Sequence, residues 1–158
     1  MRVRSFSRLM SLMLVATAAC GGRARPEPAA APNSAQYLTP YGVPTRPFSP
    51  AVRVGNMLYL SGQIGTADAS SSSVVPGGIE PETRQTLENI KDVLQRTGSS
   101  MDRVVKCTVM MADMREWDRM NVVYASYFPR NKPARSALGA NGLALGARVE
   151  IECWATVG

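Results

Sequence analysis

The 158-residue chain contains no histidine, and this absence limits the chemistry that it can perform. Serine–histidine and cysteine–histidine nucleophile systems, histidine general bases and histidine-ligated zinc sites are all excluded. The three cysteines, Cys20, Cys107 and Cys153, have no CxxC spacing, which argues against a zinc ribbon or a thioredoxin-type site. Among the side chains that remain, guanidinium groups can bind a substrate, and carboxylates can activate water.

Arg135 and Glu150 are residues of these two types. A guanidinium group binds a carboxylate through two parallel N–H···O bonds. A carboxylate can hold and polarise water, and burial raises its pKa toward a value suited to proton transfer. Residue type alone does not single them out, because most arginines and strand glutamates face solvent.

The segments that must position these side chains alternate between strands and helices. A first helix is expected from Glu80-Pro81 to Gly98, and a second between the Asp113/Glu116 capping box and Pro129. The expected strands are residues 51–54, 57–61, 104–111, 134–140 and 148–157. This order predicts an α+β two-layer sandwich, a mixed sheet with both helices on one face. We expect Arg135 and Glu150 on the uncovered face, where another subunit would meet them.

The N-terminus has the pattern of an export signal. Three arginines lie in the first eight residues, an apolar run follows, and Ala18-Ala19 precedes Cys20. We expect residues 1–19 to be a lipoprotein-type signal peptide and Cys20 to be lipidated, which gives an outer-membrane lipoprotein facing the periplasm. A plain signal for a secreted soluble protein and a chain that is not exported remain alternatives.

Residues 20–47 are rich in proline and alanine and predict a tether between the membrane anchor and a folded domain at 48–158. The formal net charge is +6, but the basic residues beyond the leader are scattered and form no run. Binding to nucleic acid is therefore not expected.

Three separated motifs resemble the RidA-like reactive intermediate deaminases, also called the YjgF or L-PSP family. Residues 54–64 (VGNMLYLSGQI) resemble its first signature, and residues 83–91 (TRQTLENIK) resemble its first helix. Residues 133–136 (PARS), followed by 149–152 (VEIE), resemble its C-terminal signature. The resemblance covers about residues 46–158.

The resemblance implies a chorismate-mutase-like homotrimer with sites between subunits. Such proteins hydrolyse small 2-imino or 2-aminoacrylate acids to 2-oxo acids and ammonia without metal or cofactor. By position in the motifs, Arg135 would bind the substrate carboxylate and Glu150 would orient the attacking water. Asn121, Ser61 and Gly62 would line the site, with backbone groups near Gly62 available to the imine nitrogen.

Two positions depart from the pattern of the best-known deaminases. Phe48 stands where they have a site tyrosine, and Ala137 stands where they have a cysteine. Both changes make the expected pocket more apolar. They favour larger or more apolar substrates, or else a trimeric binding protein for small carboxylate ligands with weak or no turnover. A ribonuclease activity, reported for some relatives, is less favoured because the basic character is weak.

Cys107 and Cys153 fall on the apolar faces of their expected strands. Two small buried core residues are the simplest interpretation. An oxidising compartment would permit a disulfide, but sequence spacing does not say whether the two Cα atoms lie within bonding reach.

Overall fold

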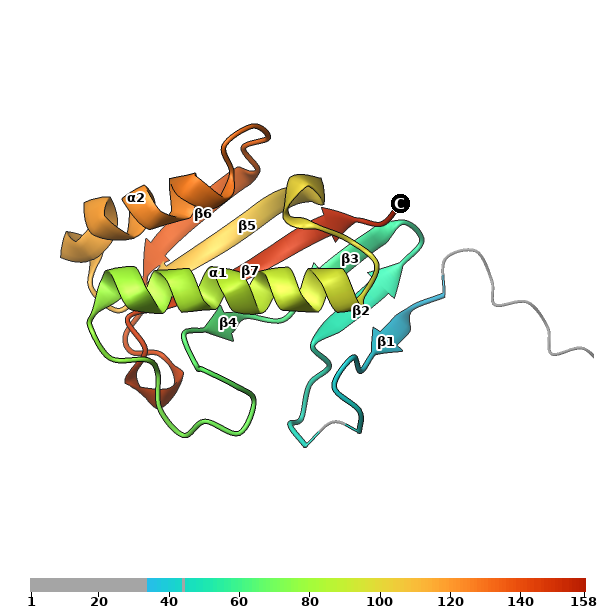
Figure 1. Cartoon of the computed structure of the whole chain (residues 1–158), viewed down its shortest axis with the longest axis horizontal. Coiled ribbons are helices and arrows are strands. Elements are labelled where there is room, and N and C mark those ends of the chain that lie inside the picture. Colours follow the sequence, from blue (N-terminus) through green and yellow to red (C-terminus); the bar gives the residue numbers. More distant parts are fainter. Residues whose placement is uncertain (1–33, 44) are drawn as a thin grey trace, which may run out of the picture.

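The computed structural model describes residues 34–43 and 45–158. They form one mixed seven-stranded sheet with α1 and α2 on one face (Figure 1). The strands are β1 (Gln36–Leu38), β2 (Ala51–Val54), β3 (Met57–Leu60), β4 (Gln63–Ile64), β5 (Val104–Met111), β6 (Ala134–Gly139) and β7 (Val149–Thr156). Within the described residues the helices are α1 (Ile79–Arg96), α2 (Trp117–Tyr127) and the short 3-10 helices η1 (Met101–Arg103), η2 (Met114–Glu116) and η3 (Ala144–Gly146). The expected α+β sandwich is confirmed.

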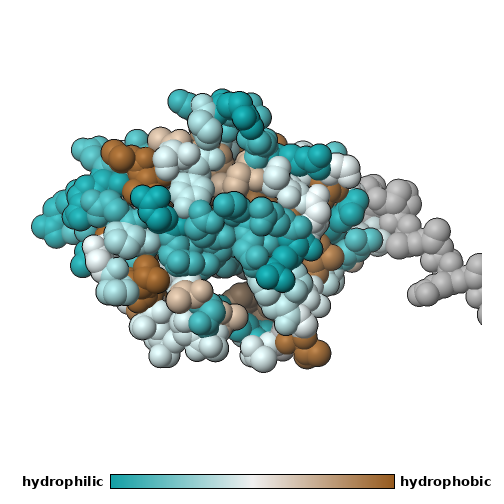
Figure 2. Space-filling view, viewed as in Figure 1, coloured by the Kyte–Doolittle hydropathy of each residue, from teal (hydrophilic) through white to brown (hydrophobic). Residues whose placement is uncertain are grey.

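Helix α1 forms where the sequence places an apolar stripe at helical spacing. Leu87, Ile90 and Leu94 are fully buried against the sheet. The helix ends at Arg96, and Gly98 then takes a φ of +84°, a left-handed conformation that glycine adopts at little cost. The outer side of the helix is polar, and Figure 2 shows a hydrophilic band along α1 on this side of the molecule.

The sheet order is β1-β2-β3-β7-β5-β6, with β4 also paired to β7. All pairs are antiparallel except β5 and β6, which are parallel because α2 crosses over between them. Strand β6 therefore lies at the edge of the sheet, and its register sets Arg135 opposite Cys107.

The two faces of the sheet differ in what covers them. Along β7, Val149, Ile151 and Cys153 are fully buried and face the helices. Glu150 and Trp154 alternate with them and face the other side, which no helix of the described residues covers. The core thus fills the space between the sheet and the helices, and the second face presents polar and aromatic side chains.

Two local expectations need correction, the tether and the capping box. Strand β1 lies inside residues 20–47 and pairs with β2, so the part of the expected tether from Gln36 onward includes a sheet strand. This strand has only three residues and is largely exposed, so the sequence shows no alternation of apolar and polar residues there. Strand β4 has only two residues and was not expected. The proposed signal segment and Cys20 lie outside the described residues.

The expected capping box is also different in detail. The Asp113 side chain accepts a hydrogen bond from the backbone N–H of Arg115 and caps η2 rather than an α-helix. Glu116 does not reach back to complete the box; its carboxylate accepts hydrogen bonds from Arg148, at 2.9 and 3.0 Å. Helix α2 then begins at Trp117 without a side-chain cap.

Cys107 and Cys153, whose pairing the sequence left open, form a disulfide between β5 and β7.

None of the helices within residues 34–43 and 45–158 is long and apolar enough to span a membrane.

Candidate functional site

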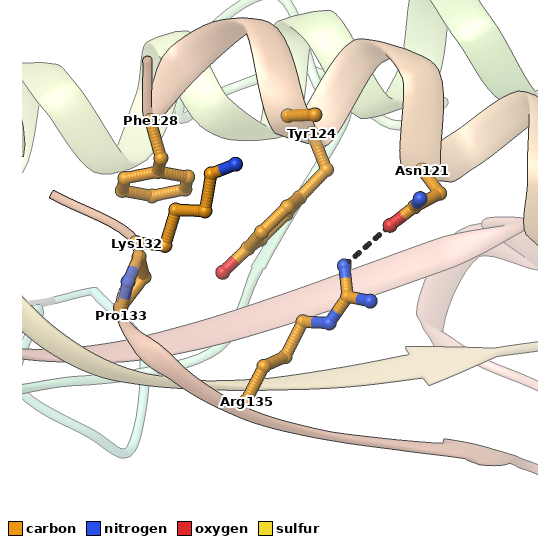
Figure 3. Close-up of a pocket in the computed structure, with 7 residues that line it drawn as sticks. Asn121, Tyr124, Phe128, Lys132, Pro133 and Arg135 are labelled. Atoms are coloured by element: carbon orange, nitrogen blue, oxygen red, sulfur yellow. Dashed lines mark hydrogen bonds between the residues drawn. The ribbon is translucent and has the colours of Figure 1, made fainter. Parts of the chain in front are cut away.

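Arg135 is held beneath α2 by an amide and two aromatic rings, and Figure 3 shows the amide, from Asn121, and one of the rings, that of Tyr124. Its Nη1 donates a 2.8 Å hydrogen bond to Oδ1 of Asn121. The guanidinium carbon lies 4.9 Å from the ring centre of Trp117 and 4.6 Å from that of Tyr124, within cation–π range. Arg135 has no carboxylate partner among the described residues. The charge is therefore fixed in place while most of its N–H donors remain available to an anion. We call Arg135, Asn121, Trp117 and Tyr124 the arginine region.

A pocket of about 300 Å³ opens beside Arg135. Its lining residues, from α2 and the segment leading into β6, are Asn121, Tyr124, Ala125, Phe128, Lys132, Pro133 and Arg135. The rings of Tyr124 and Phe128 pack 4.9 Å apart and make one wall largely apolar. Burial raises the pKa of Tyr124 to about 12, so its hydroxyl stays protonated at neutral pH.

Glu150 lies on the helix-free face of β7, paired with Ile64 of β4. Gly62 lies directly against it: a Cβ at position 62 would collide with the Glu150 carboxylate. The chain therefore requires glycine at position 62 for this approach. Burial and, second, the charge of Glu152 raise the pKa of the Glu150 carboxyl group. We call Glu150, Gly62 and Ser61 the glutamate region.

Ser61 joins the glutamate region to the loop that carries Phe48. Its hydroxyl donates a 2.7 Å hydrogen bond to the carbonyl of Ser49, and its N–H donates to the carbonyl of Pro50. The serine thus stabilises this turn, and its oxygen keeps the capacity to accept a hydrogen bond. The Phe48 ring is 45% exposed, so this aromatic side chain is available for contact with a ligand or another chain.

Polar side chains of α1 anchor the strands of the glutamate region. The buried Glu82 carboxylate accepts a 2.8 Å hydrogen bond from the N–H of Arg148, at the start of β7. The Asn89 amide donates to the carbonyls of Ile64 and Thr66, both at 3.0 Å. These contacts fix β4 and the first residues of β7, and they were not anticipated from the sequence.

The arginine and glutamate regions project from opposite faces of the sheet. The expectation that Arg135 shares the uncovered face with Glu150 is therefore wrong. Paired residues on neighbouring strands point to the same side, and Arg135 pairs with the fully buried Cys107, so its side chain turns toward α2. Ala137, two residues further along β6, packs against the core on that same side. One chain thus brings Arg135 and Asn121 together, with Ala137 on the same face of β6, but it does not bring Arg135 and Glu150 together.

The sequence missed the roles of Trp117 and Tyr124. Tyr124 is buried and Trp117 is partly buried on the inner side of α2, and nothing in the sequence indicates an arginine between them. Among the described residues, no three histidine, cysteine or acidic side chains lie close enough together to hold a metal ion. The chemistry available in one chain is carboxylate binding in the arginine region and water or proton handling in the glutamate region.

Comparisons with known proteins agree with the fold and the motifs. The family model described as Endoribonuclease L-PSP matches residues 41–157. The mouse protein named 2-iminobutanoate/2-iminopropanoate deaminase is 43% identical over 112 residues, which are 71% of this chain and 82% of the mouse protein. The crystal structure of yeast YEO7 has a TM-score of 0.73 and 35% identity, covering 79% of this chain and 100% of the yeast chain.

A further solved structure, Escherichia coli TdcF with bound serine, has a TM-score of 0.67 and 27% identity. It covers 73% of this chain and 91% of the TdcF chain. Because the family model spans most of the sequence and the similarity to the mouse deaminase covers 82% of that protein, the chain belongs to the RidA-like family, also called the YjgF or L-PSP family.

Proposed function

We propose that this protein hydrolyses small reactive 2-imino acids, and their 2-aminoacrylate tautomers, to 2-oxo acids and ammonia. The main observation in support is the position of the Arg135 guanidinium group. Asn121, Trp117 and Tyr124 hold it in place, and it has no carboxylate partner among the described residues. The mouse relative named as a deaminase of this substrate class supports it.

In this reaction Arg135 binds the substrate carboxylate through paired N–H···O bonds. The Glu150 carboxylate orients a water molecule and accepts its proton as the oxygen attacks the imine carbon. Return of that proton to nitrogen gives a tetrahedral carbinolamine. When the hydroxyl proton of this intermediate also passes to nitrogen, the C–N bond breaks, ammonia leaves and the carbonyl of the 2-oxo acid forms. Water and the imino acid supply every atom of the products. Gly62 packs against the Glu150 side chain, which supports a role for the backbone groups beside Gly62 in binding the imine nitrogen.

The opposite orientation of Arg135 and Glu150 requires a second copy of the chain in each site. We propose a homotrimer in which the arginine region of one subunit meets the glutamate region of the next, since head-to-tail contacts of this kind close into rings. Tyr59 and Trp154 stack edge to face, are both partly exposed, and belong to the helix-free face that such an assembly would cover.

The apolar wall of the pocket indicates which substrate side chains the site would accept. Tyr124 and Phe128 line it, and Ala137 and Phe48 place a methyl group and an unsubstituted ring in the proposed site. We therefore propose a preference for 2-imino acids with apolar side chains. The same two residues favour the alternative function, a trimeric protein that binds small carboxylates with weak or no turnover. Ammonia release separates the two functions.

Mixing two impaired variants tests both the reaction and the sharing of sites. Arg135→Ala and Glu150→Gln proteins are assayed separately and after subunit exchange, by ammonia release from 2-imino acids generated in situ. Random mixing restores one intact arginine and one intact glutamate at about a quarter of the interfaces. Recovery to about a quarter of wild-type activity is expected. No recovery, once mass spectrometry has verified exchange, contradicts shared sites; an inactive wild type contradicts the deaminase.

We further propose that Cys20 carries lipid and anchors the protein at the outer membrane, facing the periplasm. The order of arginines, apolar run and Ala-Ala-Cys-Gly supports this. Replacing Cys20 with serine should move the protein from the membrane fraction to the soluble fraction. A wild-type chain that is already soluble would instead indicate a secreted soluble protein or a chain that is not exported.

A further inference from the structure

The disulfide between Cys107 and Cys153 lies at the centre of the sheet, beneath the helices. The two residues face each other directly on antiparallel strands β5 and β7, with their Cα atoms 4.1 Å apart. This is well inside the roughly 7 Å beyond which a disulfide cannot close without backbone movement. Both side chains are 0% exposed and belong to the main hydrophobic core.

This burial restricts when the bond can form. Disulfides form by attack of a thiolate on another disulfide through a mixed intermediate, which requires access to the attacking sulfur. In the folded domain neither sulfur is accessible, and an apolar environment also disfavours the thiolate. Oxidation must therefore occur before α1 and α2 close over the strand pair. The same burial protects the completed bond from reductants.

We infer that Cys107 and Cys153 are oxidised while the chain is still unfolded, by a thiol–disulfide oxidoreductase, and that the domain is built to mature in an oxidising compartment. Two thiols lose two protons and two electrons, and the disulfide of the oxidoreductase is reduced to a dithiol. Disulfides of this kind persist outside reducing compartments. The inference rests on the core of the domain alone and is independent of the N-terminal motif and of the deaminase reaction.

The bond also connects β7, which carries Glu150, to β5, the strand that pairs with the Arg135 strand β6. Cys107 is the Cα partner of Arg135 on β6, and Cys153 lies three residues beyond Glu150 on β7. Closing a loop with a sequence separation of 46 removes conformational freedom from the unfolded chain. The disulfide thus acts as a permanent constraint on β5 and β7 rather than as a switch.

Peptide mapping of the full chain tests the inference directly. The protein produced with its own N-terminus is unfolded without reductant, alkylated and cut with trypsin, which cleaves after Lys106, Arg115 and Arg148. The expected product is residues 107–115 linked to residues 149–158. A variant lacking residues 1–19, kept in the cytoplasm, should instead yield both peptides alkylated. Unlinked peptides from the full chain would overturn the inference. Linked peptides from the cytoplasmic variant would overturn the claim that the bond needs an oxidising compartment.

Two further measurements distinguish a buried structural disulfide from two cysteines that only pack against each other in the core. Reduction by dithiothreitol should be at least tenfold slower in the native protein than in urea, and equal rates would contradict formation before folding. Cys107→Ala, Cys153→Ala and the double variant should each lower the Tm by about 10 °C, because each removes the same bond. Additive losses, with the double variant falling by the sum of the singles, would indicate packing instead.

Discussion

The arginine region and the glutamate region hold their charged groups in different ways. Arg135 is fixed by a hydrogen bond to Asn121 and by rings on both sides, all within one chain. The Glu150 carboxylate has backbone packed against it at Gly62, and no hydrogen bond to it is found among the described residues. The group proposed to bind the substrate carboxylate is thus already positioned in the isolated chain, whereas the proposed catalytic carboxylate of Glu150 is not. This difference suggests that assembly matters more for turnover than for recognition.

Changing Glu150 should have the largest effect on turnover. Glu150→Gln keeps the shape of the side chain but cannot accept the proton of water, so kcat should fall about 100-fold or more. The KM should change little, because the arginine region is intact. Steady-state ammonia release measures both. A large rise in KM with an unchanged kcat would assign Glu150 to substrate binding. The two regions would then not differ in the way proposed, one in binding and the other in turnover.

Changing Arg135 should act mainly on binding. Arg135→Ala removes charge-assisted hydrogen bonds, which corresponds to a roughly tenfold to hundredfold rise in KM. Arg135→Lys keeps the charge but loses the planar fork and the ring stacking, and it should restore only part of the affinity. Retention of full affinity by Arg135→Ala would mean that the carboxylate binds elsewhere.

Adding one methyl group at Gly62 should disturb the glutamate region alone. The new Cβ in Gly62→Ala displaces the Glu150 carboxylate, and we expect kcat to fall about tenfold or more. Gly139→Ala is a matched control, because its Cβ would meet only the flexible side chain of Met114. Equal losses in the two variants would point to general destabilisation, which thermal melts would reveal.

Removing the Asn121 amide should loosen Arg135 without releasing it. Asn121→Ala deletes one hydrogen bond, while Trp117 and Tyr124 still enclose the guanidinium, so KM should rise only about fivefold. Val122→Ala is the control on the same helix, since Val122 is 73% exposed. A loss as large as that of Arg135→Ala would show that the rings contribute little to positioning.

The smallest effect concerns pH and stability. Burial and the neighbouring Glu152 raise the pKa of Glu150, so kcat should fall on acidification at a pH above the ordinary glutamate value of 4.5. The stability that protonated Glu150 gives is present below pH 4.5 and is lost as pH rises through the raised pKa. Glu150→Gln avoids that loss. Its Tm relative to wild type should therefore be higher at pH 7 than at pH 4, and a constant difference would contradict the raised pKa.

The sequence predicted best where one face of an element is strongly apolar. Strand β5 has the bounds expected from its alternation, and α1 follows its leucine and isoleucine stripe. Strand β6 shows the opposite case. Its residues, Ala-Arg-Ser-Ala-Leu-Gly, are small or mixed on both sides, so the direction of Arg135 depended on pairing with β5, which periodicity does not contain.

The cysteine pair was unpredictable for a similar reason. Cys107 and Cys153 were correctly expected on apolar strand faces, but only the antiparallel register of β5 and β7 puts them opposite each other. The stacking of Trp117 and Tyr124 on Arg135 likewise depends on where α2 lies over the sheet edge. Local pattern specifies elements and faces, whereas contacts between distant segments require the assembled sheet.

The chain has only two tryptophans, one in the arginine region and one on the helix-free face of the sheet. The ring of Trp117 lies 4.9 Å from the guanidinium carbon of Arg135, and Trp154 is 41% exposed on the helix-free face. Each is a built-in fluorophore for a different event. With Trp154→Phe, the emission of Trp117 reports a ligand arriving at Arg135. With Trp117→Phe, the emission of Trp154 reports the covering of its face as protein concentration rises, so recognition and assembly can be followed optically and apart.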